Sequence, residues 1–464
     1  MRSLRSSAIC RSLVVAASLL VIFGLAACET VPESSPGRLG QGATAHEPVT
    51  APPAPTTPPG APPEGETAAP PLEAPPAPTL AAPSETGPVK VALLLPLSGA
   101  NAAVGRALLD AAQLALFDAG NDRLALLPRD TGATPEGAAA AAEAALSEGA
   151  QLILGPLFAA EVTAVAPLAR ARGINLIGFS TDRTVAGDGV YLLGFSPEQQ
   201  VERVVSFASA RGLHHFAALA PETPYGNSVV EALRRAAVKA GGSVSRVATY
   251  PPDTVDFTAV VRRFADFERR RGALAAQKQA LAEKGDEISR EALRRLEGVE
   301  SLGDTGFDAL LLAEGGARLK ALAPILPYYD IDPAKVRFFG TGQWDQPDIV
   351  TEPALLGGWF PAAPPASAAS FRARFESAYG RRPLRIASLG YDAVALAAVL
   401  AQQDGPNRFG RDAIANPNGF IGFDGIFRFG AAGVAERGLA VMEIQSKGFK
   451  VVDPAPETFE SIGQ

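Results

Sequence analysis

From Val89 onward, short apolar runs alternate with amphipathic stretches, and this alternation constrains the fold more than any other feature of the sequence. Residues 89–95 are almost continuously apolar, as in a parallel strand that is buried on both faces. Residues 102–119 follow with apolar side chains at helical spacing, and similar pairs of segments recur as far as a strand predicted at 336–340. Such alternation is typical of parallel sheets with crossover helices. The units are too many for one small sheet, so we predict an α/β fold with two lobes.

The start of the chain is predicted to direct export and lipid attachment. Three arginines precede an apolar stretch over residues 13–27, which is too short to cross a bilayer comfortably as a helix. The stretch ends in Leu-Ala-Ala-Cys, so residues 1–27 are predicted to be a lipoprotein signal peptide and Cys28 to carry the lipid. A plain secretory signal with a chance cysteine is the alternative. Glu29 favours the periplasmic face of the outer membrane over the inner membrane.

A proline-rich segment separates Cys28 from the α/β body. Residues 46–88 hold 15 of the 40 prolines of the chain. This composition cannot build a core and predicts an extended tether, partly polyproline II. We therefore assign residues 28–88 to the lipid anchor and a disordered tether. No later run of apolar residues is long enough to predict a transmembrane helix.

A charged segment interrupts the α/β alternation. Residues 262–297 carry 17 charged side chains in 36, ten basic and seven acidic, at helical spacing. We predict a charged helical insertion over residues 262–302. Two interpretations remain open for it, a solvated helical hairpin or an arm that binds a partner protein.

The residues of several common chemistries are missing. The net charge of -7 argues against general nucleic-acid binding, and 3 histidines with 2 cysteines leave little for a metal site. No phosphate-binding loop, serine-nucleophile elbow or zinc-protease motif occurs. Asp-Thr-Gly occurs at residues 130–132 and 304–306, but paired aspartic proteases are all-β and these copies lie between strands and helices. We therefore predict a protein that is not an enzyme, with no cofactor and no metal.

Several motifs, taken in order, resemble the type I periplasmic binding proteins of the leucine-binding kind over about residues 88–452. The matching segments are Lys-Val-Ala-Leu-Leu-Leu-Pro-Leu-Ser-Gly at 90–99, Leu-Ile-Leu-Gly-Pro at 152–156, Ile-Asn-Leu-Ile-Gly-Phe-Ser-Thr at 174–181, Pro-Tyr-Gly at 224–226 and Gly-Phe-Ile-Gly-Phe-Asp-Gly-Ile-Phe-Arg-Phe at 419–429. The resemblance implies two Rossmann-like lobes joined by three crossovers and closing on a ligand. The lobes are expected at 88–211 with 342–420 and at 212–341 with 421–455.

The resemblance also places a ligand site beyond the carboxyl ends of the strands. Eight residues are expected near it: Ser98, Gly99, Leu157, Ser180, Thr181, Tyr225, Glu314 and Trp344. The amino-acid-binding pattern is broken, because residues 157–160 lack the hydroxyl that usually helps to hold the ligand carboxylate. Asp182 would also repel a carboxylate. The site is therefore predicted to have changed its ligand or lost it.

Anchor, tether and charged insertion together look most like another branch of this fold, the lipoprotein activators of penicillin-binding proteins. That likeness implies a regulator that binds and activates a penicillin-binding protein in peptidoglycan synthesis. The chain departs from the best-studied members, since a Pro-rich segment stands where they carry a helical-repeat domain. The alternative is a solute receptor of an ABC-type amino-acid or amide transport system, with a small-molecule ligand and an ABC permease as partners. In both cases contact with the membrane is expected only through the lipid.

Overall fold

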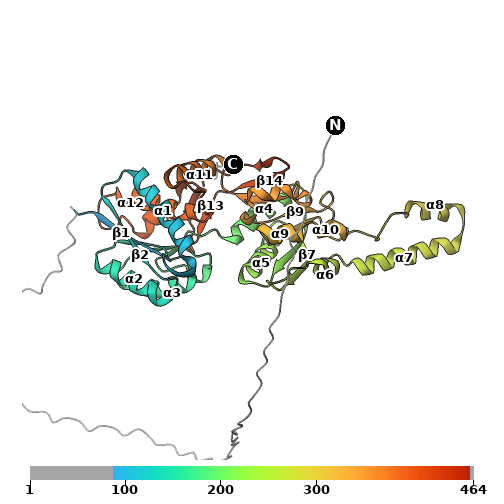
Figure 1. The fold of residues 1–464 in the computed structure, drawn as a ribbon, viewed down its shortest axis with the longest axis horizontal. Coiled ribbons are helices and arrows are strands. Elements are labelled where there is room, and N and C mark those ends of the chain that lie inside the picture. The colour runs from blue at the N-terminus through green and yellow to red at the C-terminus, as the bar shows by residue number, and fades with distance from the viewer. Residues whose placement is uncertain (1–86, 460–464) are drawn as a thin grey trace, which may run out of the picture. The chain divides into compact units, whose positions relative to one another are not determined.

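The structure is a computed structural model of the chain, and it describes residues 87–459 (Figure 1). The predicted signal peptide, the lipid attachment at Cys28 and nearly all of the predicted tether lie outside the described residues. The described part contains two α/β lobes, each with its own sheet, and a small third sheet. The predicted two-lobe α/β fold is therefore confirmed. Within residues 87–459, no helix has both the length and the apolar character needed to span a bilayer.

The first lobe is built on a five-stranded parallel sheet. Its elements are β1 (Val89–Leu95), η1 (Gly99–Asn101), α1 (Ala102–Ala119), β2 (Leu124–Asp130), α2 (Pro135–Ser147), β3 (Leu152–Leu154), α3 (Ala159–Ala171), β4 (Leu176–Gly178), η2 (Arg183–Val185) and β5 (Val190–Leu192). The strand order is β2-β1-β3-β4-β5. Three helices from the C-terminal part of the chain complete this lobe: α11 (Pro365–Tyr379), α12 (Ala387–Ala401) and α13 (Arg411–Ile414).

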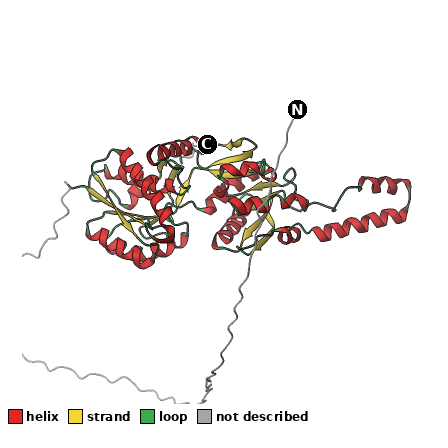
Figure 2. Cartoon of the chain, in the orientation of Figure 1, coloured by secondary structure: helices red, strands yellow, loops and turns green. Residues whose placement is uncertain are grey.

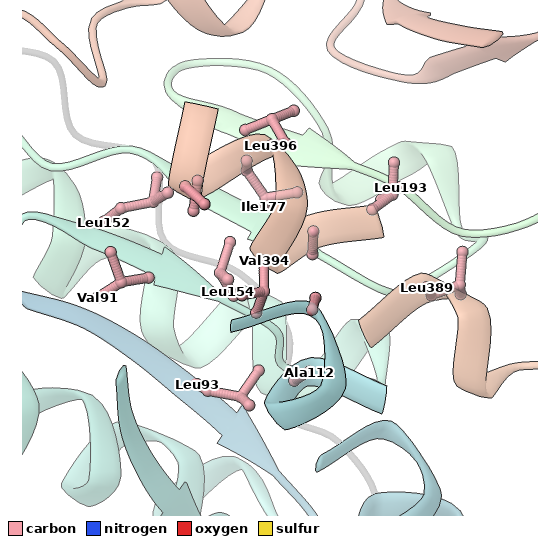
Figure 3. Packing of buried hydrophobic residues seen from close by; sticks show 14 of the residues in the cluster. Val91, Leu93, Ala112, Leu152, Leu154, Ile177, Leu193, Leu389, Val394 and Leu396 are labelled. Atoms are coloured by element: carbon pink, nitrogen blue, oxygen red, sulfur yellow. The ribbon is translucent and has the colours of Figure 1, made fainter. Parts of the chain in front are cut away.

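Both faces of this sheet are covered by helices. Leu93 of β1 packs against α1 and α12, whereas its neighbour Leu94 packs against α2 and α3. Figure 3 shows the first of these two cores, with Leu93, Ala112 and Val394 among its side chains. Burial on both sides is the physical reason for the unbroken apolar run in β1.

The second lobe is built on a seven-stranded mixed sheet. Its elements are α4 (Pro197–Ser209), β6 (His215–Pro221), α5 (Pro224–Lys239), β7 (Ser243–Tyr250), α6 (Thr258–Phe264), β8 (Ala309–Leu312), α9 (Gly316–Leu322), α10 (Ile325–Tyr328), β9 (Arg337–Phe339), η3 (Gly342–Trp344), η4 (Pro347–Thr351), η5 (Pro353–Leu355), β10 (Trp359–Ala362), β14 (Ala440–Gln445) and β15 (Gly448–Asp453). The strand order is β15-β14-β10-β9-β8-β6-β7, and β14 and β15 run antiparallel to their neighbours. Helices α4 and α5 cover one face, and α6, α9 and α10 cover the other.

A small antiparallel sheet completes the first lobe. It consists of β11 (Phe420–Gly422), β12 (Gly425–Phe429) and β13 (Ala435–Arg437). Phe427 and Phe429 of β12 are buried in the core that α12 covers, and the ring of Phe429 meets that of Tyr191 at 5.2 Å. The segment thus belongs to the first lobe through its packing.

The lobe boundaries differ from the predicted ones at three places. Helix α4 was expected in the first lobe, but its apolar face packs with α5 against Phe216 of the second sheet. Strand β10 was also expected there, but it pairs with β9 and β14. Strands β12 and β13 were expected in the second lobe, and they pack in the first. The periodicity of apolar residues indicates that a segment has a buried face. Which sheet the segment joins depends on contacts with segments that are distant in the sequence.

The first lobe therefore comprises residues 88–193 and 365–437, and the second comprises residues 197–362 and 439–455. The chain passes between them three times, as the resemblance implied. These passages follow β5, β10 and β13. We call them the first, second and third crossover.

The charged insertion forms a helical hairpin on the second lobe. It consists of α7 (Phe267–Lys284) and α8 (Glu287–Arg295), which project beyond the sheets (Figures 1 and 2). Gly285 has a left-handed backbone (φ 64°), and Asp286 then caps α8 by accepting a hydrogen bond from the Ser289 N–H at 2.7 Å. Leu274 is buried, whereas most other side chains of the insertion are exposed. The prediction of a helical insertion is confirmed.

Candidate functional site

A cavity of about 380 Å³ lies where the chain crosses between the lobes. Phe195 of the first crossover lines it, together with Ala362 and Leu439, which border the second and third crossovers in the second lobe. The volume is in the range of small-molecule sites. The lining residues are Thr181, Phe195, Ser196, Pro197, Gln199, Gln200, Tyr225, Thr341, Gly342, Gln343, Asp345, Gln346, Pro361, Ala362, Arg385, Arg437 and Leu439.

Two glutamines in the first turn of α4 bond to one element of each lobe at this cavity. Ser196 caps α4 by accepting a hydrogen bond from the Gln199 N–H at 3.4 Å, which holds the turn beside the first crossover. Nε2 of Gln199 donates to the carbonyl of Ala435 at 2.6 Å, and Oε1 of Gln200 accepts from the Gly342 N–H at 2.6 Å. One helix start therefore holds the small sheet of the first lobe and the η3 turn of the second.

Tyr225 and Thr341 supply a pair of hydroxyls to the same cavity. Their oxygens are 2.7 Å apart, and they join the start of α5 to the turn after β9. Thr223 caps α5 by accepting from the Gly226 N–H at 3.1 Å, which sets the position of Tyr225 in the first turn. Burial raises the pKa of Tyr225 to about 12, with the Thr341 hydrogen bond opposing the shift. At neutral pH the site therefore offers a neutral phenol that donates or accepts.

Two guanidinium groups approach the ring of Phe195. The Cζ atom of Arg385 lies 4.2 Å from the ring centroid, and that of Arg437 lies 5.0 Å from it. Both distances are in the range of cation–π contacts. Arg385 precedes α12 and Arg437 ends β13, so the two arginines come from segments that are about 50 residues apart in the sequence. We call Phe195, Arg385 and Arg437 the arginine cluster.

Arg385 is paired with one carboxylate from each lobe. Its Nη1 lies 2.8 Å from Oδ1 of Asp424 in the first lobe, and its Nε lies 3.8 Å from Oδ2 of Asp345 in the second. Asp424 also accepts from the Ser388 hydroxyl. The Arg385 side chain is 41% exposed, and that of Asp424 is 4% exposed. Burial raises the pKa of Asp345, and Arg385 opposes that shift. The two carboxylates thus hold the Arg385 side chain in place, while part of that side chain remains exposed to solvent.

Arg437 lies deeper, with its side chain 2% exposed. Its Nη2 donates to the carbonyl of Leu193 at 2.8 Å, and its Nη1 is 3.6 Å from Oδ2 of the fully buried Asp392. Burial and the neighbouring Asp424 raise the pKa of Asp392, whereas Arg437 lowers it. The Nε and Nη1 atoms of Arg437 have no hydrogen-bond partner among the described residues. Arg437 is therefore a buried cation beside the cavity, and its charge is paired with the buried Asp392.

Thr181 and Tyr225 are the predicted site residues that line the cavity. Their contact with a ligand stays a prediction. Ser180 is buried beside Thr181, and its Oγ accepts from the Asp182 N–H at 3.1 Å. The Asp182 carboxylate caps the turn that follows and does not line the cavity. Leu157 is buried in the core of the first lobe.

Ser98 and Gly99 are in the loop after β1 and do not line the cavity. Oδ1 of Asp130 accepts from the backbone N–H groups of this loop, at 2.8 Å from Leu97 and 3.3 Å from Ser98. The hydrogen bond from the Ser98 side chain is the largest of the effects that lower the pKa of Asp130. The first Asp-Thr-Gly segment, at the end of β2, therefore holds the loop after β1.

Glu314 and Trp344, two of the predicted site residues, do not line the cavity. Trp344 is fully buried in the core of the second lobe, where its Nε1 donates to the carbonyl of Glu314 at 3.0 Å. The Glu314 carboxylate accepts from the Tyr250 hydroxyl at 3.1 Å and from Nε of Arg318 at 3.0 Å. Both side chains turn into the lobe, because apolar contacts and internal partners satisfy them there.

Sequence reasoning missed the arginine cluster and the glutamines of α4. Arg385 and Arg437 stand in unrelated segments, and neither belongs to a motif with a characteristic spacing. The signals available were weak: Arg437 borders the third crossover, and Arg385 precedes the apolar helix α12. The crossovers themselves had first to be placed correctly, and the predicted boundaries were displaced.

Comparisons with known proteins agree with this architecture. Residues 88–268 match the family described as periplasmic binding protein. An uncharacterised protein of Rickettsia prowazekii is 24% identical over 180 residues, which span 38% of this chain and 47% of that relative. The match therefore covers about half of the relative's length.

Solved structures extend the likeness to both lobes. A Rhodospirillum rubrum protein assigned to a branched-chain amino acid ABC transporter superposes with a TM-score of 0.63 at 20% identity, over 79% of this chain and 100% of that one. A solute-binding protein from R. palustris in complex with benzoate gives 0.53 at 18% identity, over 80% and 97%. The branched-chain amino acid transporter substrate-binding protein of Streptococcus pneumoniae, in complex with isoleucine, gives 0.53 at 17%, over 79% and 100%.

Two lobes, three crossovers and a cavity among those crossovers define the type I periplasmic binding protein fold, and this chain has it. Within that fold, residues 88–455 form a module like that of the leucine-binding proteins.

Proposed function

We propose that the chain is a receptor for a small solute of an ABC-type transport system. The observation that supports this most directly is the cavity at the crossovers, which is lined by polar side chains from both lobes. A solute held there touches both lobes at once, so binding favours one arrangement of the lobes over others. The solved structure of similar fold that carries benzoate is named as the solute-binding protein of an ABC transporter, and the one that carries isoleucine is named as a transporter substrate-binding protein, which favours the same role.

A thermal-shift screen of the full chain tests this proposal. A solute at a hundredfold excess over its Kd adds ~2.7 kcal/mol to the free energy of unfolding, which such a screen detects readily. Hits are then titrated by calorimetry on the wild type and on Gln200→Ala, whose side chain holds the η3 turn at the cavity. The matched control is Gln279→Ala, on the exposed part of α7. A screen without any stabilising solute contradicts the proposal.

A second function is favoured by the projecting α7–α8 hairpin. In this second proposal the chain regulates peptidoglycan synthesis by binding and activating a penicillin-binding protein, and the hairpin is the arm that contacts this partner. Most side chains of the hairpin are exposed. None of its residues lines the cavity. A pull-down with class A penicillin-binding proteins, using wild type and a chain with residues 275–295 replaced by a Gly-Ser loop, tests it. Equal capture by both chains rules out the hairpin as the arm.

Export and anchoring complete the proposal. The sequence supports lipid attachment at Cys28 and a place on the periplasmic face of the outer membrane. Labelling with a palmitate analogue in cells, followed by membrane fractionation, tests both statements. Cys28→Ser should lose the label, and Cys10→Ser should retain it.

A further inference from the structure

We propose that residues 454–459 form a strap that ties the second lobe to the first and favours the arrangement of the lobes around the cavity. We call this segment the C-terminal strap. It leaves the second lobe at the end of β15 and reaches the small sheet of the first lobe, in addition to the three crossovers. The inference goes beyond the proposed function, because it concerns a contact between the lobes that needs no solute.

The start of the strap is fixed on the second lobe by Arg203 of α4. Nη2 of Arg203 lies 2.7 Å from Oδ2 of Asp453, the last residue of β15, and donates to the carbonyl of Pro454 at 3.3 Å. Nε of the same side chain donates to the carbonyl of Leu439 at 2.7 Å. One arginine therefore holds the chain just after the third crossover and again where the strap begins.

The middle of the strap lies on the third crossover. A Cβ on Gly438 would be 3.1 Å from Cγ of Pro456 and 3.1 Å from its carbonyl oxygen, so Pro456 covers the backbone that joins β13 to β14. Pro454 and Pro456 each fix one backbone dihedral angle, which limits the slack of the segment. The strap therefore follows the crossover closely and is stiffer than an ordinary tail.

The end of the strap contacts the first lobe through Phe459, which is half-buried. Cζ of Arg428 in β12 lies 4.6 Å from the centroid of the Phe459 ring, a cation–π distance. Arg428 is itself held, because its Nε lies 2.9 Å from Oε2 of Glu436 and its Nη1 donates to the carbonyl of Pro417 at 3.3 Å. A Cβ on Gly419 would be 3.0 Å from the same ring, which thus packs against backbone as well.

A short tie between two fixed points restricts their separation. Six residues span at most about 20 Å when fully extended, so lobe movement beyond that reach must break the contact between Phe459 and Arg428. The strap thereby adds free energy to the arrangements in which this contact is intact, and it shifts the populations of the lobes towards them.

The strap also lies close to the candidate site. Phe459 lines a hollow of about 580 Å³ between α4 of the second lobe and residues 430–437 of the first. Ser196, Gln199 and Arg437 line both this hollow and the cavity at the crossovers. A lobe movement that the strap opposes would therefore change the cavity too.

The distance between the lobes, measured without any solute, tests the strap. Spin labels are placed on Asp404→Cys in the first lobe and Val238→Cys in the second, whose native side chains are 91% and 75% exposed. The full chain carries Cys10→Ser and Cys28→Ser, so that labels attach nowhere else. Double electron–electron resonance then gives the distance distribution. In Phe459→Ala we expect the population outside the wild-type peak to increase about two- to fivefold, which corresponds to the loss of one exposed cation–π contact.

Matched variants make the result specific to the contact. Phe459→Tyr keeps the ring, and Thr458→Ala changes an exposed neighbour, so both should keep the wild-type distribution. Arg428→Gln should act like Phe459→Ala, and the double variant should shift no further than either single one. An unchanged distribution in Phe459→Ala, or an equal shift in Thr458→Ala, overturns the strap. Because no solute is used, a failure of the receptor proposal leaves this test intact.

Discussion

Nη1 of Arg437 lies 3.6 Å from Oδ2 of Asp392, and these two opposite charges are almost completely withdrawn from solvent. The pair connects the end of β13 to α12, directly behind the cavity. Oδ2 of Asp392 has no hydrogen-bond partner among the described residues, while its Oδ1 accepts from the Phe423 N–H at 2.8 Å. Removing two charges from water is costly unless they are well paired. Because the contact between the two groups is long, we expect the stability of the fold to depend on whether Asp392 is ionised.

Asp392→Asn should change how stability depends on pH. Because burial raises the pKa of Asp392, the folded chain binds this proton more tightly than the unfolded chain does. The resulting stabilisation is complete below the unfolded pKa of about 3.9 and is lost as pH rises through the folded pKa. We expect the free energy of unfolding of the wild type to fall relative to that of Asp392→Asn between about pH 4 and about pH 8, as measured by urea unfolding.

Asp404→Asn is the control for that experiment, because Asp404 is an acid with a side chain 91% exposed. The comparison shows which part of the change comes from replacing a buried acid and which part comes from replacing any acid by Asn. A rise of wild-type stability relative to Asp392→Asn would mean that the attraction of Arg437 outweighs the burial of the carboxylate.

Tyr225→Phe removes the hydroxyl that meets Thr341 at 2.7 Å. The loss should lower the free energy of unfolding by about 1 kcal/mol, the usual contribution of a buried neutral hydrogen bond. Thr341→Val should cost a similar amount, and the double variant should cost less than the sum of the two. Denaturant unfolding of the four chains measures this coupling. Additive losses would show that the two hydroxyls do not interact in solution.

Two helix glycines should respond oppositely to alanine. A Cβ on Gly390 of α12 would lie 2.3 Å from the Leu108 carbonyl oxygen of α1, so Gly390→Ala must separate two closely packed helices. We expect a loss of about 1–3 kcal/mol. Gly272 in α7 has open space around it, so Gly272→Ala should raise the stability of that helix by about 0.5–1 kcal/mol. Thermal unfolding and hydrogen exchange in α7 measure the two effects; a tolerated Gly390→Ala would contradict the close approach.

Shortening the hairpin should leave the α/β body intact. Replacing residues 275–295 by a Gly-Ser loop keeps Phe267 and Arg270, which pack at the base of the insertion, and removes mainly exposed side chains. We expect an unchanged melting temperature of the body and unchanged solute affinity. Phe267→Ala, by contrast, removes a ring 5.1 Å from that of Tyr329 and should cost about 3 kcal/mol. A large loss of stability on shortening would show that the distal hairpin supports the lobe.

Much of the fold follows from local patterns in the sequence. The apolar run of β1 predicted a strand with two covered faces, and the structure shows why, since Leu93 and Leu94 enter different cores. The charged segment predicted helices with little burial, and α7 and α8 have that form. The assignment of α4, β10 and β12 to lobes failed, because it depends on which distant segment covers each apolar face.

For the candidate site, local patterns were enough to predict the two-lobe α/β architecture and Tyr225 at a helix start, because periodicity and capping act over a few residues. That Trp344 fills a core and that Phe195, Arg385 and Arg437 meet at one cavity became apparent in the folded chain alone. These three residues are far apart along the chain, so their meeting depends on where the three crossovers bring the lobes together. A charge acquires its role from the burial and partners that such long-range contacts create.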